Sequence, residues 1–180
     1  MRIIRNRRIV DDDWQHAPEA GPLPAGDVIV PVARWHAERR ELLARAGALG
    51  VRLKGDDDAY VLADDLHRFR LVALELGKFN DGRGFSQARI LREVLGYRGE
   101  LRAVGDVLRD HLAALERCGV DAYELPEHRH LDDALRGFDE ISVVYQPPGA
   151  GAELIFRRRA REQAQTGAAQ PRSRMETQRP

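Results

Sequence analysis

The sequence predicts an α/β fold built on a mainly parallel sheet of about six strands with crossover helices. Apolar runs of strand length recur along the 180 residues, and most neighbouring runs are separated by a segment with helical periodicity. The segment 122–125 follows its helix too closely for any connection except another crossover. Two architectures remain open, an open three-layer sandwich and a partial barrel, and both place functional loops at the carboxyl ends of the strands.

The stretch from Leu71 to Glu127 shows this alternation most clearly. Leu71–Leu76 is apolar except for Glu75, which is typical of a parallel strand covered on both faces. Two further strands are expected at Glu100–Val104 and Ala122–Leu125. Apolar residues at helical spacing predict two intervening helices, each closed by glycine: Ala88, Leu91 and Leu95 before Gly96, and Leu108, Leu112 and Leu115 before Gly119.

Weaker patterns extend the fold on both sides of this stretch. Apolar pairs on either side of Asn6 predict a small N-terminal hairpin. Further strands are expected at Val28–Val32, Val51–Leu53 and Ile141–Tyr145, and further helices at Trp35–Ala46, Tyr60–Phe69 and Leu131–Phe138. The expected organisation is a hairpin and connection over 1–26, anchored by Trp14, an α/β domain over 27–156, and a disordered basic tail over 157–180.

The formal net charge of zero conceals an uneven distribution of charge. The tail carries seven arginines against two glutamates, a net charge of +5, which leaves −5 for residues 1–156. No aromatic residue interleaves the tail arginines, so a solvated end is favoured over a nucleic-acid contact. No segment approaches the roughly 18 to 20 apolar residues of a membrane span, and the N-terminus lacks a signal-peptide pattern, so the protein is expected to be cytoplasmic.

Cys118 is the only cysteine in the chain. A single cysteine cannot form an intramolecular disulfide, and one thiol cannot supply the ligands of a usual iron–sulfur cluster or of a cysteine-based zinc site. Because Cys118 lies three residues after Leu115 on an apolar helix stripe, a buried structural thiol is favoured over a nucleophile.

The loop from Lys78 to Ser86 has the most chemical character in the sequence. Gly82 and Gly84 would let backbone approach a ligand, Arg83 is a planar double donor, and Ser86 lies where a helix is expected to begin. These features predict a site for an oxyanion such as sulfate, sulfite, phosphate or a carboxylate. The structural alternative has equal weight: an ordinary Asp-Gly turn, Ser86 as a helix cap, and Arg83 paired with Asp81 or Glu75.

Carboxylates suggest a second constellation. Glu75, Asp106 and either Glu124 or Glu127 would converge at one rim if they share a face of the sheet, and could bind a Mg²⁺-type cation or transfer protons. A buried ion pair between Glu75 and Arg102 is the simpler interpretation, because an unpaired buried charge is very costly.

The remaining acidic and histidine residues predict no metal site. One of the three aspartates at 56–58 is expected to cap the segment that begins at Tyr60, in a hydrated loop. His128 and His130 have no assignable third ligand.

Three runs of the sequence resemble a bacterial family of unknown function whose members are described as oxidoreductases involved in sulfite reduction. The runs are KFNDGRGFSQARILRE, YRGELRAVGDVLRDHLAALERCGVDAYEL and FDEISVVYQ, and the resemblance spans about Ile29 to Gln146. Members accompany enzymes of assimilatory sulfate reduction, so the resemblance implies a role in cysteine biosynthesis with sulfite reductase as partner. The polar and glycine positions that match the family are Asp81, Gly82, Arg83, Gly84, Ser86, Arg89, Gly105, Asp106 and Asp110.

Two functions follow as hypotheses. The first is an accessory protein of siroheme sulfite reductase, which docks on it, assists electron delivery or stabilises the complex. The second is a small enzyme, an oxidoreductase, in which Asp81, Gly82, Arg83, Gly84, Ser86, Arg89 and Gly105 bind an oxyanion or phosphorylated substrate and Asp106 or Asp110 transfers a proton. The cofactor stays open, because the sequence has no nicotinamide or flavin fingerprint.

Overall fold

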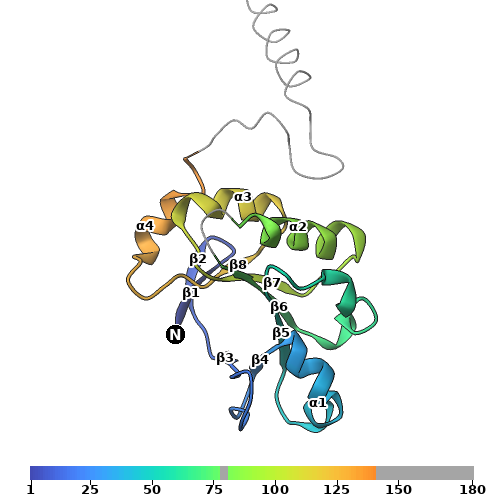
Figure 1. Ribbon diagram of the computed structural model, residues 1–180. Coiled ribbons are helices and arrows are strands. Elements are labelled where there is room, and N and C mark those ends of the chain that lie inside the picture. Colours follow the sequence, from blue (N-terminus) through green and yellow to red (C-terminus); the bar gives the residue numbers. More distant parts are fainter. Residues whose placement is uncertain (78–80, 141–180) are drawn as a thin grey trace, which may run out of the picture. The chain divides into compact units, whose positions relative to one another are not determined.

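Eight strands form one sheet in a computed structural model that describes residues 1–77 and 81–140. The strands are β1 Arg2–Arg5, β2 Arg8–Asp11, β3 Gln15–His16, β4 Val28–Pro31, β5 Leu49–Leu53, β6 Leu71–Leu76, β7 Glu100–Gly105 and β8 Ala122–Tyr123. Their order is β2-β1-β8-β7-β6-β5-β4-β3, and the sheet curls into a half-barrel (Figure 1). The α/β class and the N-terminal hairpin are therefore confirmed.

The expected sheet of about six mainly parallel strands is wrong. The sheet is mixed, because β1 pairs antiparallel with both β2 and β8, while β3 through β8 are parallel neighbours. The difference arises at the N-terminus, where the hairpin adds two strands to one edge of the parallel sheet and β3 adds one to the other edge. The expected strand Ile141–Tyr145 and the tail 157–180 lie outside the described residues.

Helices lie along the convex side of the curl (Figure 1). The described residues form four α-helices: α1 Val32–Ala44, α2 Arg83–Arg89, α3 Leu112–Arg117 and α4 Leu131–Arg136. The helix expected over Tyr60–Phe69 is wrong, since two 3₁₀ turns, Ala59–Leu62 and Leu66–Arg68, occupy this segment. The predicted aspartate cap is confirmed, because the Asp58 carboxylate accepts a hydrogen bond from the backbone N–H of Tyr60 at 3.0 Å.

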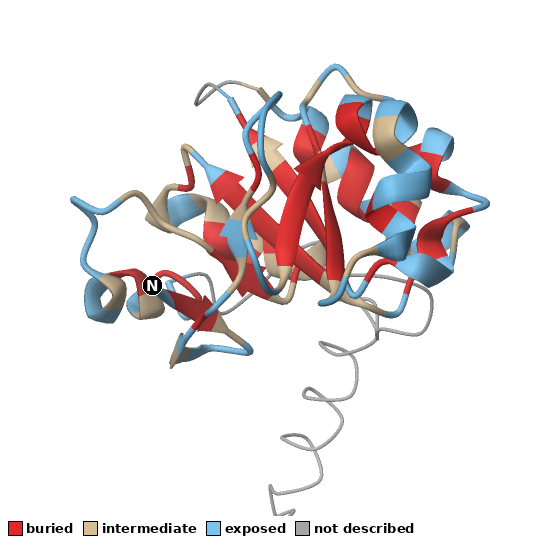
Figure 2. Ribbon diagram, turned by 90° about the horizontal axis from the view of Figure 1, so that it is seen from below, coloured by how far each residue is buried: buried red, intermediate tan, exposed pale blue. Residues whose placement is uncertain are grey.

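The main core lies between the helices and the convex face of the sheet. Alternate strand residues such as Val51, Val72 and Leu101 point to this side and are completely buried, as are Leu91 and Leu115 from the helical segments that cover them. The central strands are accordingly buried along their length, whereas the helices have one buried and one exposed side (Figure 2). No helix among the described residues is long and apolar enough to span a membrane.

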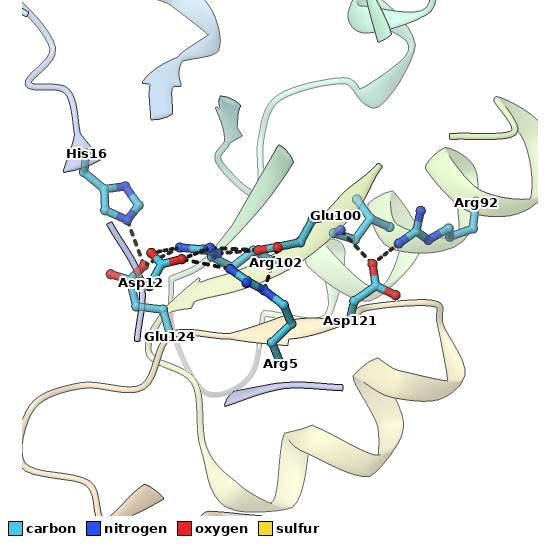
Figure 3. Close-up of polar contacts among 9 residues, drawn as sticks. Arg5, Asp12, His16, Arg92, Glu100, Arg102, Asp121 and Glu124 are labelled. Atoms are coloured by element: carbon cyan, nitrogen blue, oxygen red, sulfur yellow. Dashed lines mark hydrogen bonds and ion pairs between the residues drawn. The ribbon is translucent and has the colours of Figure 1, made fainter. Parts of the chain in front are cut away.

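The concave face of the sheet is part apolar and part charged. Trp14 packs there on a small cluster of Ile29, Leu71, Ala73 and Val104, which confirms its expected role as an anchor. Beside this cluster, Arg102 is 0% exposed, and its Nη1 and Nη2 atoms each donate to one carboxylate oxygen of Asp12 at 2.8 Å (Figure 3). Burial opposes the charge on Arg102, but Asp12 and Glu100 raise its pKa above the ordinary value.

The predicted ion pair between Glu75 and Arg102 is wrong. Arg102 pairs with Asp12, Glu100 and, at 3.8 Å, Glu124. Glu75 pairs with Arg52 instead, at 3.2 Å. The strand register explains the difference, because Arg102 lies opposite Ala73 and Glu75 lies opposite Val104, two residues further along β6 and β7.

The segment Asp12–Glu19 crosses the concave face and connects the two sides of the curled sheet. It leaves β2, contributes Asp12 to the Arg102 cluster, and then forms β3 beside β4. From β3, the Nε2 atom of His16 lies 2.9 Å from a carboxylate oxygen of Glu124, which follows β8 (Figure 3). The half-barrel is therefore closed across its interior by side chains.

We expect Asp12→Ala to lower the free energy of unfolding by about 3 to 5 kcal/mol, because it leaves the buried Arg102 charge without its bidentate partner. Urea denaturation measures this change. The control is Asp139→Ala, which removes one partner of the exposed Arg7 and should cost less than about 1 kcal/mol. Equal effects of the two substitutions would show that the Arg102 cluster does not support the fold.

Candidate functional site

The predicted oxyanion loop holds an internal ion pair. Its first residues, 78–80, lie outside the described residues, and Asp81 to Ser86 follow β6 and begin α2. The Nε and Nη2 atoms of Arg83 donate to the two carboxylate oxygens of Asp81, both at 2.8 Å. The alternative in which Arg83 pairs with Asp81 is confirmed, so the donor fork of Arg83 faces a carboxylate of the same loop.

This pair also fixes the charge state of the loop. The hydrogen bonds from the Arg83 side chain and backbone lower the pKa of Asp81 to about 2. Asp81 is therefore ionised at neutral pH and cancels the charge of Arg83. The loop after β5 lies against the pair, because a Cβ atom on Gly55 would come within 2.7 Å of Asp81 Oδ2.

Two of the predicted ligand glycines are needed for packing. A Cβ atom on Gly84 would lie 2.6 Å from Leu76 Cδ2, so this glycine lets α2 approach β6. Gly105 has φ of +85°, and a Cβ atom there would lie 2.6 Å from the carbonyl oxygen of Leu76. Gly82 is exposed, and a Cβ atom on it would meet no other atom within 4 Å, so it alone of these three faces open space.

The loop after β7 adjoins the β6–α2 loop, since the N–H of Asp106 donates to the carbonyl of Leu76 at 2.9 Å, but no hydrogen bond or ion pair among the described residues joins Arg83 to Ser86, Arg89, Asp106 or Asp110. Ser86 is exposed within α2 and does not cap it, since the helix begins at Arg83 after Gly82. Arg89 pairs with Glu93 on the same helical segment at 3.3 Å. Asp106 is half-buried after β7 and Asp110 is exposed in the turn Arg109–His111. No hydrogen bond or ion pair joins either carboxylate to another described residue.

The predicted carboxylate constellation is divided among other partners. Glu75 pairs with Arg52, while Glu124 contacts His16 and Arg102. Across residues 1–77 and 81–140, no group of three or more histidine, cysteine, aspartate or glutamate side chains is arranged to hold a metal ion. The described residues therefore give no support to the alternative in which these carboxylates bind a cation at this rim.

Basic residues at the carboxyl end of β5 are neutralised in the same way. Lys54 Nζ lies 2.8 Å from Glu19 Oε1, and Arg52 Nη2 lies 3.4 Å from the same oxygen. The hydrogen bond from Lys54 lowers the pKa of Glu19, and the same contact raises the pKa of Lys54. Arg52, Lys54 and Arg83 thus each contact a carboxylate of the chain itself.

A cavity of about 410 Å³ lies at the opposite end of the strands, where β6 and β7 begin. It is lined by Ala63, Leu66, His67, Phe69, Leu95, Gly96, Tyr97, Arg98 and Gly99. Tyr97 is buried in its wall, where burial raises the pKa of its hydroxyl, which donates to the carbonyl of Phe69 at 3.1 Å. This cavity was not predicted from the sequence, although the two glycines that bracket Tyr97 and Arg98 indicate a loop between the second helix and β7.

Cys118 is half-buried at the end of α3, and burial raises the pKa of its thiol. A raised pKa reduces the thiolate fraction, so the predicted structural role fits its surroundings better than a nucleophilic one.

The family described as "Bacterial protein of unknown function (DUF934)" matches residues 50–156. No curated protein matches the chain.

The Asp81 carboxyl should titrate with a midpoint of about 2, and Arg83→Gln should return the midpoint towards the ordinary 3.8, because it removes the hydrogen bonds that favour the charged form. Carboxyl-carbon NMR across the acid range measures both values. Because the native pKa is depressed, stabilisation by the pair is complete above 3.8 and is lost as the pH falls through about 2. An unchanged midpoint in the variant would contradict the pairing.

Proposed function

The chain belongs to the bacterial DUF934 family, and we propose that it serves assimilatory sulfite reduction as an accessory protein of siroheme sulfite reductase. In this role it contributes to cysteine biosynthesis by binding the reductase, and the reductase carries the redox chemistry. The three runs that resemble proteins of sulfite reduction all lie within residues 50–156, the part of the chain that the family covers.

One observation favours the accessory role over an independent enzyme: the Nε and Nη2 donors of Arg83 are both engaged by Asp81. An oxyanion would have to displace this carboxylate before it could bind the same edge of the guanidinium in a bidentate manner. The two candidate acids, Asp106 and Asp110, also lack a described side-chain partner that would orient them for proton transfer. A docking protein needs neither an arginine with unoccupied donors nor a carboxylic acid held in position for proton transfer.

The first test is growth of a strain that lacks this gene, supplied in turn with sulfate, sulfite or cysteine as sole sulfur source. We expect growth on cysteine and loss of growth on both sulfate and sulfite, because the block lies at the sulfite step. Rescue by sulfite would move the function upstream of that step. Growth on all three sources would contradict any role in the pathway.

Complementation then separates the two functions. The accessory role predicts that Arg83→Ala restores growth on sulfate as well as the wild-type gene does, since Arg83 already has its partner in Asp81. The enzyme alternative predicts loss of growth with this variant, provided that circular dichroism shows the protein to be folded. Purified protein adds a second readout, because a yellow colour would indicate a bound flavin and favour the enzyme.

A further inference from the structure

We propose that the cavity at the start of β6 and β7 is a docking site for a partner protein, and that its occupant is an acidic segment carrying one bulky apolar side chain. The inference rests on the proposed function only for the existence of a protein partner. It adds the surface that binds the partner and the chemistry that the surface recognises.

The floor of the cavity is apolar. Leu66 and Phe69 lie there with 6% and 4% of their surface exposed, and Leu95 packs beside them. A cavity of about 410 Å³ with such a floor is large enough to accept one large apolar side chain, which is the usual form of an anchor at a protein interface.

The rim of the cavity carries an arginine that has no carboxylate partner among the described residues. His67 and Arg98 are exposed lining residues, and neither side chain forms a hydrogen bond or ion pair with another described residue. None of the nine lining residues is acidic. The side chain of Arg70, which precedes β6 and whose backbone carbonyl accepts a hydrogen bond from the N–H of Glu100, is also exposed and unpaired within the described residues. Carboxylates of a partner could accept hydrogen bonds from these exposed donor groups.

The contrast with the carboxyl end of the strands strengthens this argument. There, Arg52, Lys54 and Arg83 each contact a carboxylate supplied by the chain. At the amino end, the described part of the chain leaves Arg98 without one, although it lies beside an apolar cavity. Charge complementarity therefore points to an acidic partner at this end of the sheet.

Two exposed apolar residues lie close in the chain to residues that line the cavity. Val61 and Val94 are 46% and 63% exposed, and they lie within two positions of the lining residues Ala63 and Leu95 in the chain. The two short helical segments that carry them, Ala59–Leu62 and Ile90–Val94, contact each other. Two exposed apolar side chains on adjoining segments favour a polypeptide partner over a small anion.

The wall of the cavity is held in place by the chain itself. Arg92 Nη1 donates to the carbonyls of Tyr97 and Gly99, both at 2.8 Å, and the Tyr97 hydroxyl is fixed on Phe69. A Cβ atom on Gly99 would lie 2.2 Å from the Tyr97 hydroxyl oxygen, so glycine at this position lets the backbone pack against the Tyr97 side chain. A preformed site binds its partner with a smaller entropic cost.

The test uses the full-length chain labelled with ¹⁵N and a blocked synthetic peptide of aspartate, glutamate, phenylalanine, aspartate and glutamate. We expect the peptide to shift the amide signals of residues 96–99. A peptide with serine in place of phenylalanine, a peptide with lysine in place of the acids, and an oligothymidylate should bind more weakly. Absence of shifts at 96–99 would overturn the proposal, and so would tighter binding of the oligothymidylate.

Two variants test the two parts of the site. Arg98→Glu reverses the rim charge and should weaken peptide binding by roughly tenfold, which corresponds to about 1.4 kcal/mol. Ala63→Trp is an exposed substitution that fills the cavity and should abolish the shifts. The matched control is Arg8→Glu, the same charge change on the exposed surface of edge strand β2, which should bind as the wild type does. Wild-type affinity in both cavity variants would overturn the proposal.

Capture of purified sulfite reductase by the immobilised chain distinguishes this inference from the proposed function. If Arg98→Glu and Ala63→Trp no longer capture the reductase while Arg8→Glu still does, the result supports both the docking site and the accessory role. If both cavity variants capture the reductase as well as the wild type does, the docking site is wrong and the accessory role stands. If the wild type binds the peptide through the cavity but not the reductase, the accessory role fails and the docking site stands.

Discussion

The fold depends on a buried cluster of charges centred on Arg102. Arg102 is inaccessible to water, and the cost of burying its guanidinium is offset only because Asp12 binds it with both carboxylate oxygens and Glu100 holds its Nε atom. Arg5 joins the same cluster through Asp12 and Glu100, which ties the N-terminal hairpin to β7. The hairpin thus adds antiparallel strands to the sheet and also supplies Arg5, while Asp12 follows directly after β2.

Residue patterns determine most of the convex side of this fold and little of the concave side. The run Leu71–Leu76 predicted β6 correctly, because every residue except Glu75 is apolar and buried. β3 could not be predicted, because Gln15–His16 has two polar residues and forms only by backbone pairing with β4. The error over Arg102 has a related cause. The alternation of side chains along a strand shows which of its residues share a face of the sheet. It does not give the register between neighbouring strands, which decides which residues lie opposite each other.

The candidate site shows the same division between local and distant contacts. The pair between Arg83 and Asp81 was among the predicted alternatives because the partners lie two positions apart in the chain. The cavity was not predicted, because its lining comes from two segments, 63–69 and 95–99, that meet only when β6 pairs with β7. The relevant signal in the second segment, an arginine between glycines, is too common in loops to indicate a site without that contact.

The contacts of the segment Asp12–Glu19 have a consequence for biosynthesis. Asp12 meets Arg102 across 90 positions of the chain, and His16 meets Glu124 across 108. During translation, the first strands therefore leave the ribosome long before their partners exist, and the N-terminal segment must wait while most of the sheet is made. Closure of such distant contacts is entropically slow, so assembly of the N-terminal edge is expected to be a late event in folding. A nascent chain arrested before residue 102 would hold Asp12 without its buried partner, and its N-terminal segment would be exposed to chaperones and proteases.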